Sequence, residues 1–215
     1  MISTDNISVN MNSSIRIAGS QILYFDPYEI KEQKNDADVI FITHEHYDHF
    51  QPESILNIKK EGTILVAPES MKEKALKESG IPDEKCEFYR PGTVHELGKL
   101  LIETIPAYNK IKPYHPKTKR WLGYLVKMDG VSYYVSGDTD SNEEIRKVNC
   151  DVALVPIGGQ FTMGVKHAAE LIQKMKPKAV VPTHYGSVAG KPTDGTDFKE
   201  LLEGSGKDIQ VDLKL

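Results

Sequence analysis

The spacing of apolar and polar residues divides the first part of the chain into short strands and helices. Residues 14–27 (SIRIAGSQILYFDP) predict two strands joined by a turn at Gly19-Ser20. Residues 37–42 (ADVIFI) form a short apolar run rich in β-branched side chains, which is typical of a buried strand. The other elements expected here are a helix over 52–60, a strand over 63–68 and a helix over 70–79.

The middle of the chain changes to a run of strands, and the last third alternates between helices and strands. Asp129-Gly130 is expected to form a hairpin turn within the strand-rich centre. The expected central strands lie within 85–92, 100–108 and 121–138, and they are followed by helices over 143–148, 166–176 and 196–204 and strands over 152–156, 179–186 and 209–213. This order favours an α/β fold in which two mixed sheets pack face to face with helices outside.

The composition indicates that the chain can form a packed core. It has 215 residues, of which 39% are hydrophobic and 27% charged, so we expect one domain over 1–215 and no extensive disorder. The formal net charge of −4 provides no overall attraction to nucleic acid or to an anionic membrane. We therefore expect a small-molecule substrate and no nucleic-acid partner, and an anionic substrate would need a local basic patch.

The cysteines and the first residues bear on the cellular compartment. Cys86 and Cys150 are far apart and form no CxxC motif, so we expect two reduced thiols. The start of the chain, MISTDNISVNMNSSIRIAG, has neither the basic nor the apolar region of a secretory signal. No apolar run reaches the roughly 18 residues of a membrane span. These features predict a cytoplasmic protein.

The strongest chemical signal is the segment THEHYDH, residues 43–49, directly after an expected buried strand. Three of the seven histidines fall within six residues there. His44 and His46 share a face of an extended backbone, while Asp48 and His49 can turn toward a neighbouring position. Neutral imidazoles and carboxylates are preferred zinc ligands. Four candidate ligands at one strand end predict a metal site rather than an inert polar turn.

Two later residues repeat this local design. Asp138 follows the segment SYYVSG, and His184 follows AVVPT, so each lies just after an expected strand. Loops at the strand ends of an α/β scaffold are where ligands and catalytic groups collect. Alone, each would be an ordinary turn or loop residue, but with the first cluster they complete a ligand set for two metals.

Together these segments resemble a known family. THEHYDH resembles the HxHxDH signature of the metallo-β-lactamase-fold hydrolases, SGDTD their later aspartate motif and PTHYG their closing histidine motif. The tyrosine in HEHYDH and the segment PIGGQFTMG, residues 156–164, are similar to a branch of small stand-alone hydrolases that includes relatives of ascorbate-6-phosphate lactonase. The resemblance covers nearly the whole chain and implies a four-layer αββα sandwich with a binuclear metal site at one edge of the sheets.

The family pattern also implies a role for each candidate ligand. The first metal would be bound by His44 and His46, the second by Asp48, His49 and His184, and both by a bridging Asp138. The two divalent ions are expected to be Zn²⁺, with Mn²⁺ or Fe²⁺ as alternatives.

One position departs from this pattern. The family has a histidine at the end of the strand before Asp138, where this chain has Pro106-Ala107-Tyr108-Asn109. His115, six residues further on, could supply the imidazole from a displaced loop, or Asn109 could offer a weak carbonyl ligand. We favour His115.

Such a site would support hydrolysis of a small ester, lactone or phosphoester. A water between two metals roughly 3.5–4 Å apart loses a proton near neutral pH and can attack a carbonyl or phosphoryl centre. Asp48 would orient this water and could relay a proton to the leaving group. The basic segment 110–120 (KIKPYHPKTKR) suggests an anionic substrate if it borders the site, although a solvated surface loop explains it equally well.

Two alternative functions stay open. A ribonuclease or phosphodiesterase of the same superfamily is disfavoured by the net charge and by the lack of room for a nucleic-acid-clamping insertion. A non-catalytic metal-binding or sensor protein that retains the fold is favoured by Asn109. Outside the ligand set, we expect His95 in a turn, His167 exposed at a helix start, Trp121 in the core, and Asp26 in a turn where it could support a ligand.

Overall fold

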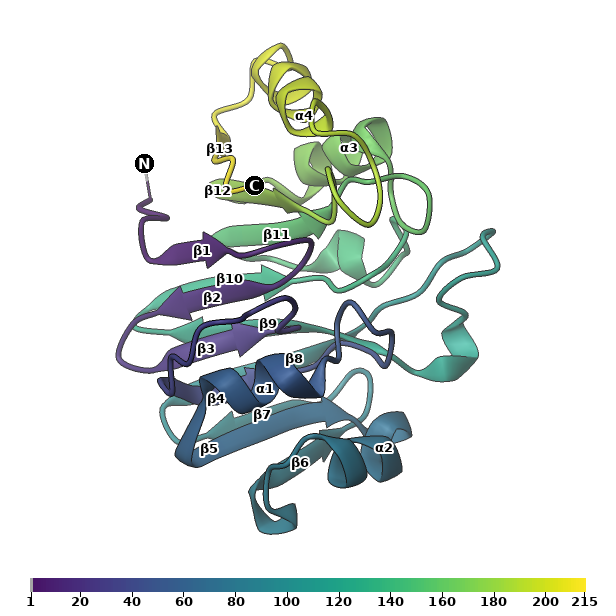
Figure 1. Cartoon of the computed structure of the whole chain (residues 1–215). Helices are drawn as coiled ribbons and strands as arrows, with labels where there is room; N and C mark the ends of the chain where they lie inside the picture. The colour runs from purple at the N-terminus through teal and green to yellow at the C-terminus, as the bar shows by residue number, and fades with distance from the viewer. Residues whose placement is uncertain (1) are drawn as a thin grey trace.

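The computed structural model of the protein describes residues 2–215, which form two β-sheets that pack face to face (Figure 1). The strands of the first sheet, in spatial order, are β1 (Ile7–Val9), β2 (Ile15–Ala18), β3 (Ile22–Phe25), β4 (Ala37–Phe41), β5 (Lys59–Pro68) and β6 (Cys86–Tyr89). Those of the second are β13 (Gln210–Val211), β12 (Ala179–Thr183), β11 (Val152–Pro156), β10 (Val131–Val135), β9 (Leu122–Met128), β8 (Leu100–Pro106) and β7 (Val94–Leu97).

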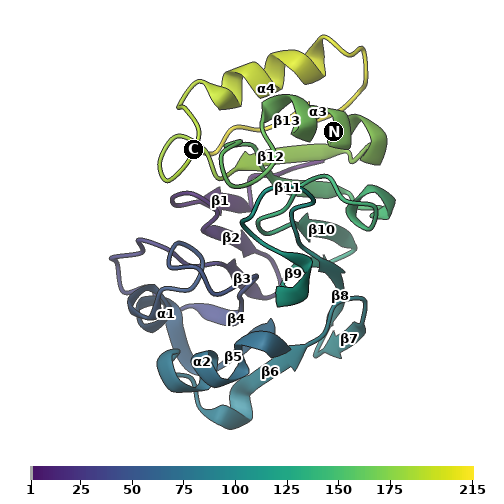
Figure 2. The same cartoon turned by 90° about the vertical axis from the view of Figure 1, so that its right-hand side faces the viewer.

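Four α-helices cover the outer faces of the two sheets. They are α1 (Pro52–Ile58), α2 (Lys72–Glu78), α3 (Val165–Met175) and α4 (Asp194–Glu203). Ile55 of α1 packs with Ile40 outside the first sheet, and Ile172 and Phe198 of α3 and α4 pack with Val180 outside the second. Figure 2 shows the two sheets as neighbouring layers with α1 and α2 beside the first. The expected αββα sandwich is therefore confirmed.

No helix within residues 2–215 combines the length and the apolar character that a membrane crossing requires.

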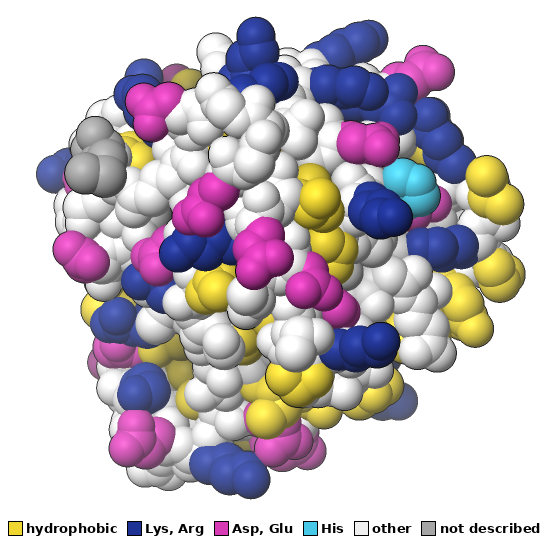
Figure 3. Space-filling model, turned by 90° about the horizontal axis from the view of Figure 1, so that it is seen from above, with side chains coloured by type: hydrophobic (Ala, Val, Ile, Leu, Met, Phe, Trp, Pro, Cys, Tyr) yellow, Lys and Arg dark blue, Asp and Glu magenta, His cyan; other side chains and the backbone are white. Residues whose placement is uncertain are grey.

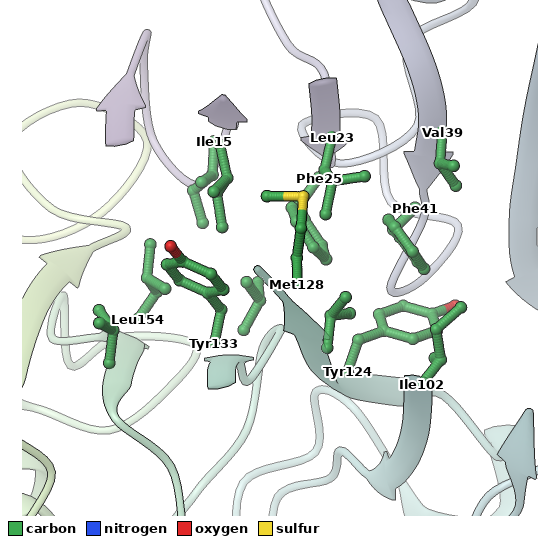
Figure 4. Packing of buried hydrophobic residues seen from close by; sticks show 14 of the residues in the cluster. Ile15, Leu23, Phe25, Val39, Phe41, Ile102, Tyr124, Met128, Tyr133 and Leu154 are labelled. Atoms are coloured by element: carbon green, nitrogen blue, oxygen red, sulfur yellow. The ribbon is translucent and has the colours of Figure 1, made fainter. Parts of the chain in front are cut away.

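The core between the sheets is built from alternate residues of the strands. Phe25 and Phe41 of the first sheet stack with ring centroids 4.7 Å apart, and Tyr124 of the second sheet lies 5.1 Å from Phe41 (Figure 4). Leu23 and Leu154 extend this cluster to neighbouring strands. Since side chains alternate between the faces of a strand, the same residues that fill this layer fix which loop residues follow each strand end.

The strands that lead to the candidate ligands end at the same edge of the sandwich. β3 and β4 are parallel, and β10, β11 and β12 are parallel. β8 runs with β10 because both are antiparallel to β9, and β1 runs with β3 because both are antiparallel to β2. A hydrogen bond of 3.1 Å from the Leu122 amide to the Thr43 carbonyl joins the two sheets at this edge. The loops after β1, β3, β4, β8, β10 and β12 therefore meet in one region.

Several local expectations were wrong. The helix expected over 143–148 is only a 3₁₀ turn at Ile145–Lys147, because so short a segment gains too few helical hydrogen bonds to offset nucleation. The strand expected over 209–213 is limited to the two residues of β13, and β1 and β7 were not expected because each has few apolar positions. His95 lies in β7 rather than in a turn, and its ring stacks on Tyr89 with centroids 3.6 Å apart.

A hydrogen bond from the core to the strand end gives the first testable prediction. The buried Tyr124 hydroxyl donates to the Ile42 carbonyl at 2.7 Å. Tyr124→Phe would leave this buried carbonyl without its donor, so we expect the free energy of unfolding in urea to fall by about 1–3 kcal/mol. Tyr134→Phe is the control, because the buried Tyr134 hydroxyl has no hydrogen-bond partner among residues 2–215. Equal losses in both variants would contradict this assignment.

Candidate metal centre

The loops at this edge bring all seven predicted ligands into one cluster. These residues are His44, His46, Asp48, His49, His115, Asp138 and His184. They follow β4, β8, β10 and β12, and all except the half-buried His46 are buried. Their proximity is a property of the structure, and their role as metal ligands stays a prediction.

Three imidazoles and one carboxylate form the first half of the cluster. Nε2 of His44 lies 3.0 Å from Nδ1 of His46, and Nε2 of His115 lies 3.2 Å from the same His46 atom. Oδ2 of Asp138 lies 3.2 Å from Nε2 of His115 and 4.0 Å from Nε2 of His44. Ligand atoms that surround zinc tetrahedrally at about 2.0–2.1 Å are about 3.3 Å from one another, so this spacing suits a metal.

The second half of the cluster uses both oxygens of the same carboxylate. Nε2 of His49 lies 3.3 Å from Oδ1 of Asp138 and 3.4 Å from Oδ2 of Asp48. Nε2 of His184 lies 3.3 Å from Oδ2 of Asp48 and 3.2 Å from Oδ2 of Asp138. Asp138 therefore faces both halves, as a residue shared by two cations would.

Several buried atoms of the cluster have no hydrogen-bond partner. They include Nε2 of His49, Nε2 of His184 and Oδ1 of Asp138. Buried polar atoms in folded proteins are nearly always hydrogen-bonded, and leaving one unpaired costs about 1–3 kcal/mol. These atoms point toward one another at metal-ligand spacing, so a pair of divalent cations fits the residues present.

His115, rather than Asn109, reaches the cluster. His115 has a left-handed backbone with φ of 57°, and its Nε2 faces His46 and Asp138. The Asn109 amide donates to the carbonyl of Phe161 at 2.6 Å and lies 3.3 Å from Nδ1 of His115. Asn109 therefore contacts the His115 ring from outside the cluster, and the expectation that His115 supplies the third imidazole of the first site stays a prediction.

Asp26 fixes the orientation of two rings from behind. This fully buried carboxylate accepts hydrogen bonds from Nδ1 of His49 at 2.7 Å and from the amide and hydroxyl of Thr43 at 2.7 and 2.6 Å. Because the Thr43 hydroxyl donates to Asp26, it accepts from Nδ1 of His44 at 3.0 Å. Both histidines thus present an unprotonated Nε2 when neutral, as metal ligands must. Asp26, which was expected in a turn, therefore supports two candidate ligands through these hydrogen bonds.

Two further residues contact the cluster, Asn12 and Trp121. Asn12 was not expected from the sequence, and Trp121 was expected only as a core residue. The side-chain amide of Asn12, in the loop after β1, donates to Oδ2 of Asp48 at 2.9 Å, and the backbone carbonyl of Asn12 accepts from the backbone amide of His184 at 2.9 Å. An asparagine just after a strand was the available signal, but β1 was not predicted. Trp121 is buried as expected, yet it packs against the candidate ligands, with its ring 4.8 Å from that of His44.

The charges of the cluster depend on burial and on close partners. Burial alone would raise the pKa of Asp138, but the adjacent His184 and His49 hold it well below its ordinary value. Burial would lower the pKa of His184, but Asp138 and Asp48 raise it to about 9. Burial and the neighbouring His49 lower the pKa of His44 well below its ordinary value. Burial would likewise lower the pKa of His49, but Asp138 and Asp26 raise it well above its ordinary value. The metal-free cluster therefore combines ionised carboxylates with protons on His184 and His49 at neutral pH.

A cavity of about 300 Å³ opens above the candidate ligands. Its other lining residues are Tyr47, Tyr114, Phe161 and Val188. The basic segment 110–120 contributes Tyr114 and His115 to the lining but none of its lysines. Three of the four lysines have other partners, which are Gly159 and Asp140 for Lys112, Glu144 for Lys117 and Glu45 for Lys119. The sequence of this segment showed its charge but not these partners.

His167, the remaining histidine outside the sheets, is exposed in α3, as expected from the sequence. It takes no part in the clusters of candidate ligands among residues 2–215.

Comparisons with known proteins identify the family of this chain. The profile of the β-lactamase superfamily domain matches residues 11–184. A UPF0173 metal-dependent hydrolase of Thermococcus kodakarensis is 30% identical over 203 residues, 89% of each chain, and one of Pyrococcus furiosus is 31% identical over 205 residues, also 89% of each. A crystal structure from Parabacteroides distasonis, titled as that of a metal-dependent hydrolase, is 28% identical with a TM-score of 0.80, covering 97% of this chain and 92% of its own.

The support from Asp26 generates a prediction for metal binding. In Asp26→Asn, the amide cannot accept from both His49 and Thr43 as the carboxylate does, so we expect zinc affinity to fall by about 10–100-fold. Competition with a fluorescent zinc chelator measures this change. Asp38→Asn is the matched control, because Asp38 pairs with the surface residue Lys60 at 2.7 Å. Unchanged zinc affinity in Asp26→Asn would contradict the role of Asp26 in orienting the candidate ligands.

The raised pKa of His184 predicts a dependence on pH. A metal must displace its proton, so apparent zinc affinity should increase as the pH rises from 6.5 toward about 9. The proton also stabilises the metal-free fold fully below the unfolded value of 6.5, and this contribution disappears as the pH rises through about 9. Zinc competition and thermal unfolding of chelator-treated protein test both trends. Zinc affinity independent of pH over this range would show that His184 is neutral before metal binds.

Proposed function

The chain belongs to the metallo-β-lactamase superfamily of metal-dependent hydrolases, and from this premise we propose that it hydrolyses a small ester, lactone or phosphoester with two zinc ions. The observation that carries the proposal is the position of Asp138. Its carboxylate faces His115 on one side and His49 on the other at 3.2 and 3.3 Å. A carboxylate shared between two ligand groups is what a two-metal site requires.

The proposal divides the cluster into two ligand groups. The first zinc would be held by His44, His46 and His115, the second by Asp48, His49 and His184, and Asp138 would contact both. When bound, the two cations would lower the pKa of a water molecule and polarise the carbonyl or phosphoryl group that it attacks. The nitrogen-rich ligand set supports zinc, and manganese or iron are the alternatives.

Asp48 is proposed to guide the proton. It lines the cavity. Burial alone would raise its pKa, but the adjacent His184 and His49, whose Nε2 atoms lie 3.3 and 3.4 Å from Oδ2 of Asp48, keep it below its ordinary value. The carboxylate is therefore ionised at neutral pH and can accept a hydrogen bond from the attacking water. The amide of Asn12 holds Oδ2 of Asp48 at 2.9 Å, which fixes the direction of this acceptor.

The competing functions have weaker support. The sensor hypothesis drew on Asn109, but His115 fills the corresponding place beside His46 and Asp138. The ribonuclease hypothesis needs cations at the site, and no lysine or arginine lines the cavity. The kinship with ascorbate-6-phosphate lactonase stays a prediction.

A cytoplasmic location is also part of the proposal. It is supported by Cys86 and Cys150, which are both free thiols rather than partners in a disulfide.

Removing Asp138, the proposed shared ligand, or His46, a proposed ligand of the first zinc only, tests the proposed mechanism. We expect Asp138→Ala and His46→Ala to lower zinc-dependent hydrolysis by more than about a hundredfold, because loss of mere supporting residues already costs 10–100-fold. Turnover of a panel of esters, lactones and phosphodiesters is measured together with bound zinc. His167→Ala is the control, since this exposed side chain lies outside the cluster.

Full turnover with zinc bound in both ligand variants would reject the assignment. Two equivalents of zinc with hydrolysis support the proposed enzyme, whereas one tightly bound equivalent without turnover supports the sensor.

A further inference from the structure

Two aromatic pairs flank the cavity above the candidate metal centre. On the side of the first sheet, Tyr47 meets Tyr28 edge to face, with ring centroids 6.0 Å apart and an interplanar angle of 74°. On the side of the second sheet, Tyr114 meets Phe161 with centroids 4.9 Å apart and an angle of 90°. Val188, from the loop after β12, is also part of the lining. The entrance is therefore mainly aromatic.

The rings of Tyr47, Tyr114 and Phe161 form an aromatic wall, which is held at a fixed place relative to the candidate ligands. The backbone carbonyl of Phe161 accepts the Asn109 amide at 2.6 Å and lies 3.3 Å from Nδ1 of His115. Tyr114 directly precedes His115, and Tyr47 lies between the candidate ligands His46 and Asp48. A substrate group beside the scissile bond would therefore lie against these rings.

Apart from the candidate metal ligands, the cavity lining has no charged side chain that could hold an anionic group. It contains no lysine or arginine. Tyr47 and Tyr114 are 66% and 45% exposed, so much apolar surface there can still be removed from water. Figure 3 shows apolar side chains at the right-hand side of the molecule, the side on which the segment 110–120 projects in Figure 1.

We propose that the substrate carries an uncharged aromatic or branched apolar group next to the cleaved bond. This group lies between Tyr47 and the pair formed by Tyr114 and Phe161. A cavity of about 300 Å³ is at the small end for ligand sites, so it fits one ring rather than a polymer. The inference rests on the proposed function, and it concerns the group beside the cleaved bond, whereas the expectation of an anionic substrate stays a prediction.

Binding of three hydroxamates to the zinc-loaded protein tests this inference without relying on turnover. Acetohydroxamate, phenylacetohydroxamate and the monohydroxamate of succinate share one zinc-binding group and differ in the attached group. Burial of a phenyl ring should make phenylacetohydroxamate bind at least about tenfold more tightly than acetohydroxamate in calorimetry. The succinate derivative should bind no more tightly than acetohydroxamate.

Variants locate this preference on the aromatic wall. In Tyr114→Ala and Phe161→Ala, we expect the ratio of the phenylacetohydroxamate and acetohydroxamate affinities to fall toward one. A general change in the metal centre would alter both affinities equally and leave their ratio unchanged. If Phe161→Ala does not fold because Phe161 is half-buried, Tyr114→Ala at the exposed position still tests the inference. Ile111→Ala is the matched control, because this side chain of the same loop is 93% exposed and outside the lining.

The outcomes separate the inference from its premise. A ratio near one in the unaltered protein, or tightest binding of the succinate derivative, overturns the substrate class and leaves the zinc site intact. If no hydroxamate binds although zinc is retained, the open metal site of the proposed function fails, and the inference fails with it.

Discussion

Three carboxylates, Asp26, Asp48 and Asp138, are buried where the two sheets meet at one edge. An ionised carboxylate in a protein interior is costly unless cations or hydrogen-bond donors surround it. Here the donors are imidazoles, and they come from both sheets: Asp138 of the second sheet faces His49 of the first at 3.3 Å. The charges can be compensated only when the sheets pack in one arrangement. The stacked core around Phe41 sets that arrangement, so packing and the site depend on each other.

The close approach of the two sheets at this edge has a specific backbone requirement. Gly137, directly before Asp138, has φ of 62°, and a Cβ atom added there would lie 2.9 Å from Cβ of Thr43. Thr43 in turn connects Asp26 with His44 through its hydroxyl. A larger residue at position 137 would separate the ligand loops of the two sheets. The glycine therefore serves the same constraint as the buried carboxylates.

The sequence predicted those parts of the site that follow strongly apolar strands. Asp138 and His184 could be found because each comes after a buried run, and the resulting αββα sandwich is observed. Asn12 could not be found, because β1 has only three residues and its loop shows no ligand motif. The role of Asp26 depends on partners 17 and 23 positions away, Thr43 and His49, which only packing brings together. Strand patterns predict where ligands emerge, whereas supporting contacts depend on tertiary structure.

The position of His115 on a loop gives the lysines of the basic segment a structural role. A histidine carried on a loop must be held in place from outside, since no strand fixes its direction. Lys119 joins this loop to Glu45, which lies between two candidate ligands, at 2.8 Å, and Lys112 binds the Gly159 carbonyl at 2.9 Å. Each surface ion pair contributes only about 0–1 kcal/mol, but together the contacts restrict one short segment. Because Tyr114 directly precedes His115, the contacts that hold the candidate ligand also hold Tyr114 at the cavity. A change in this loop would therefore move both side chains together.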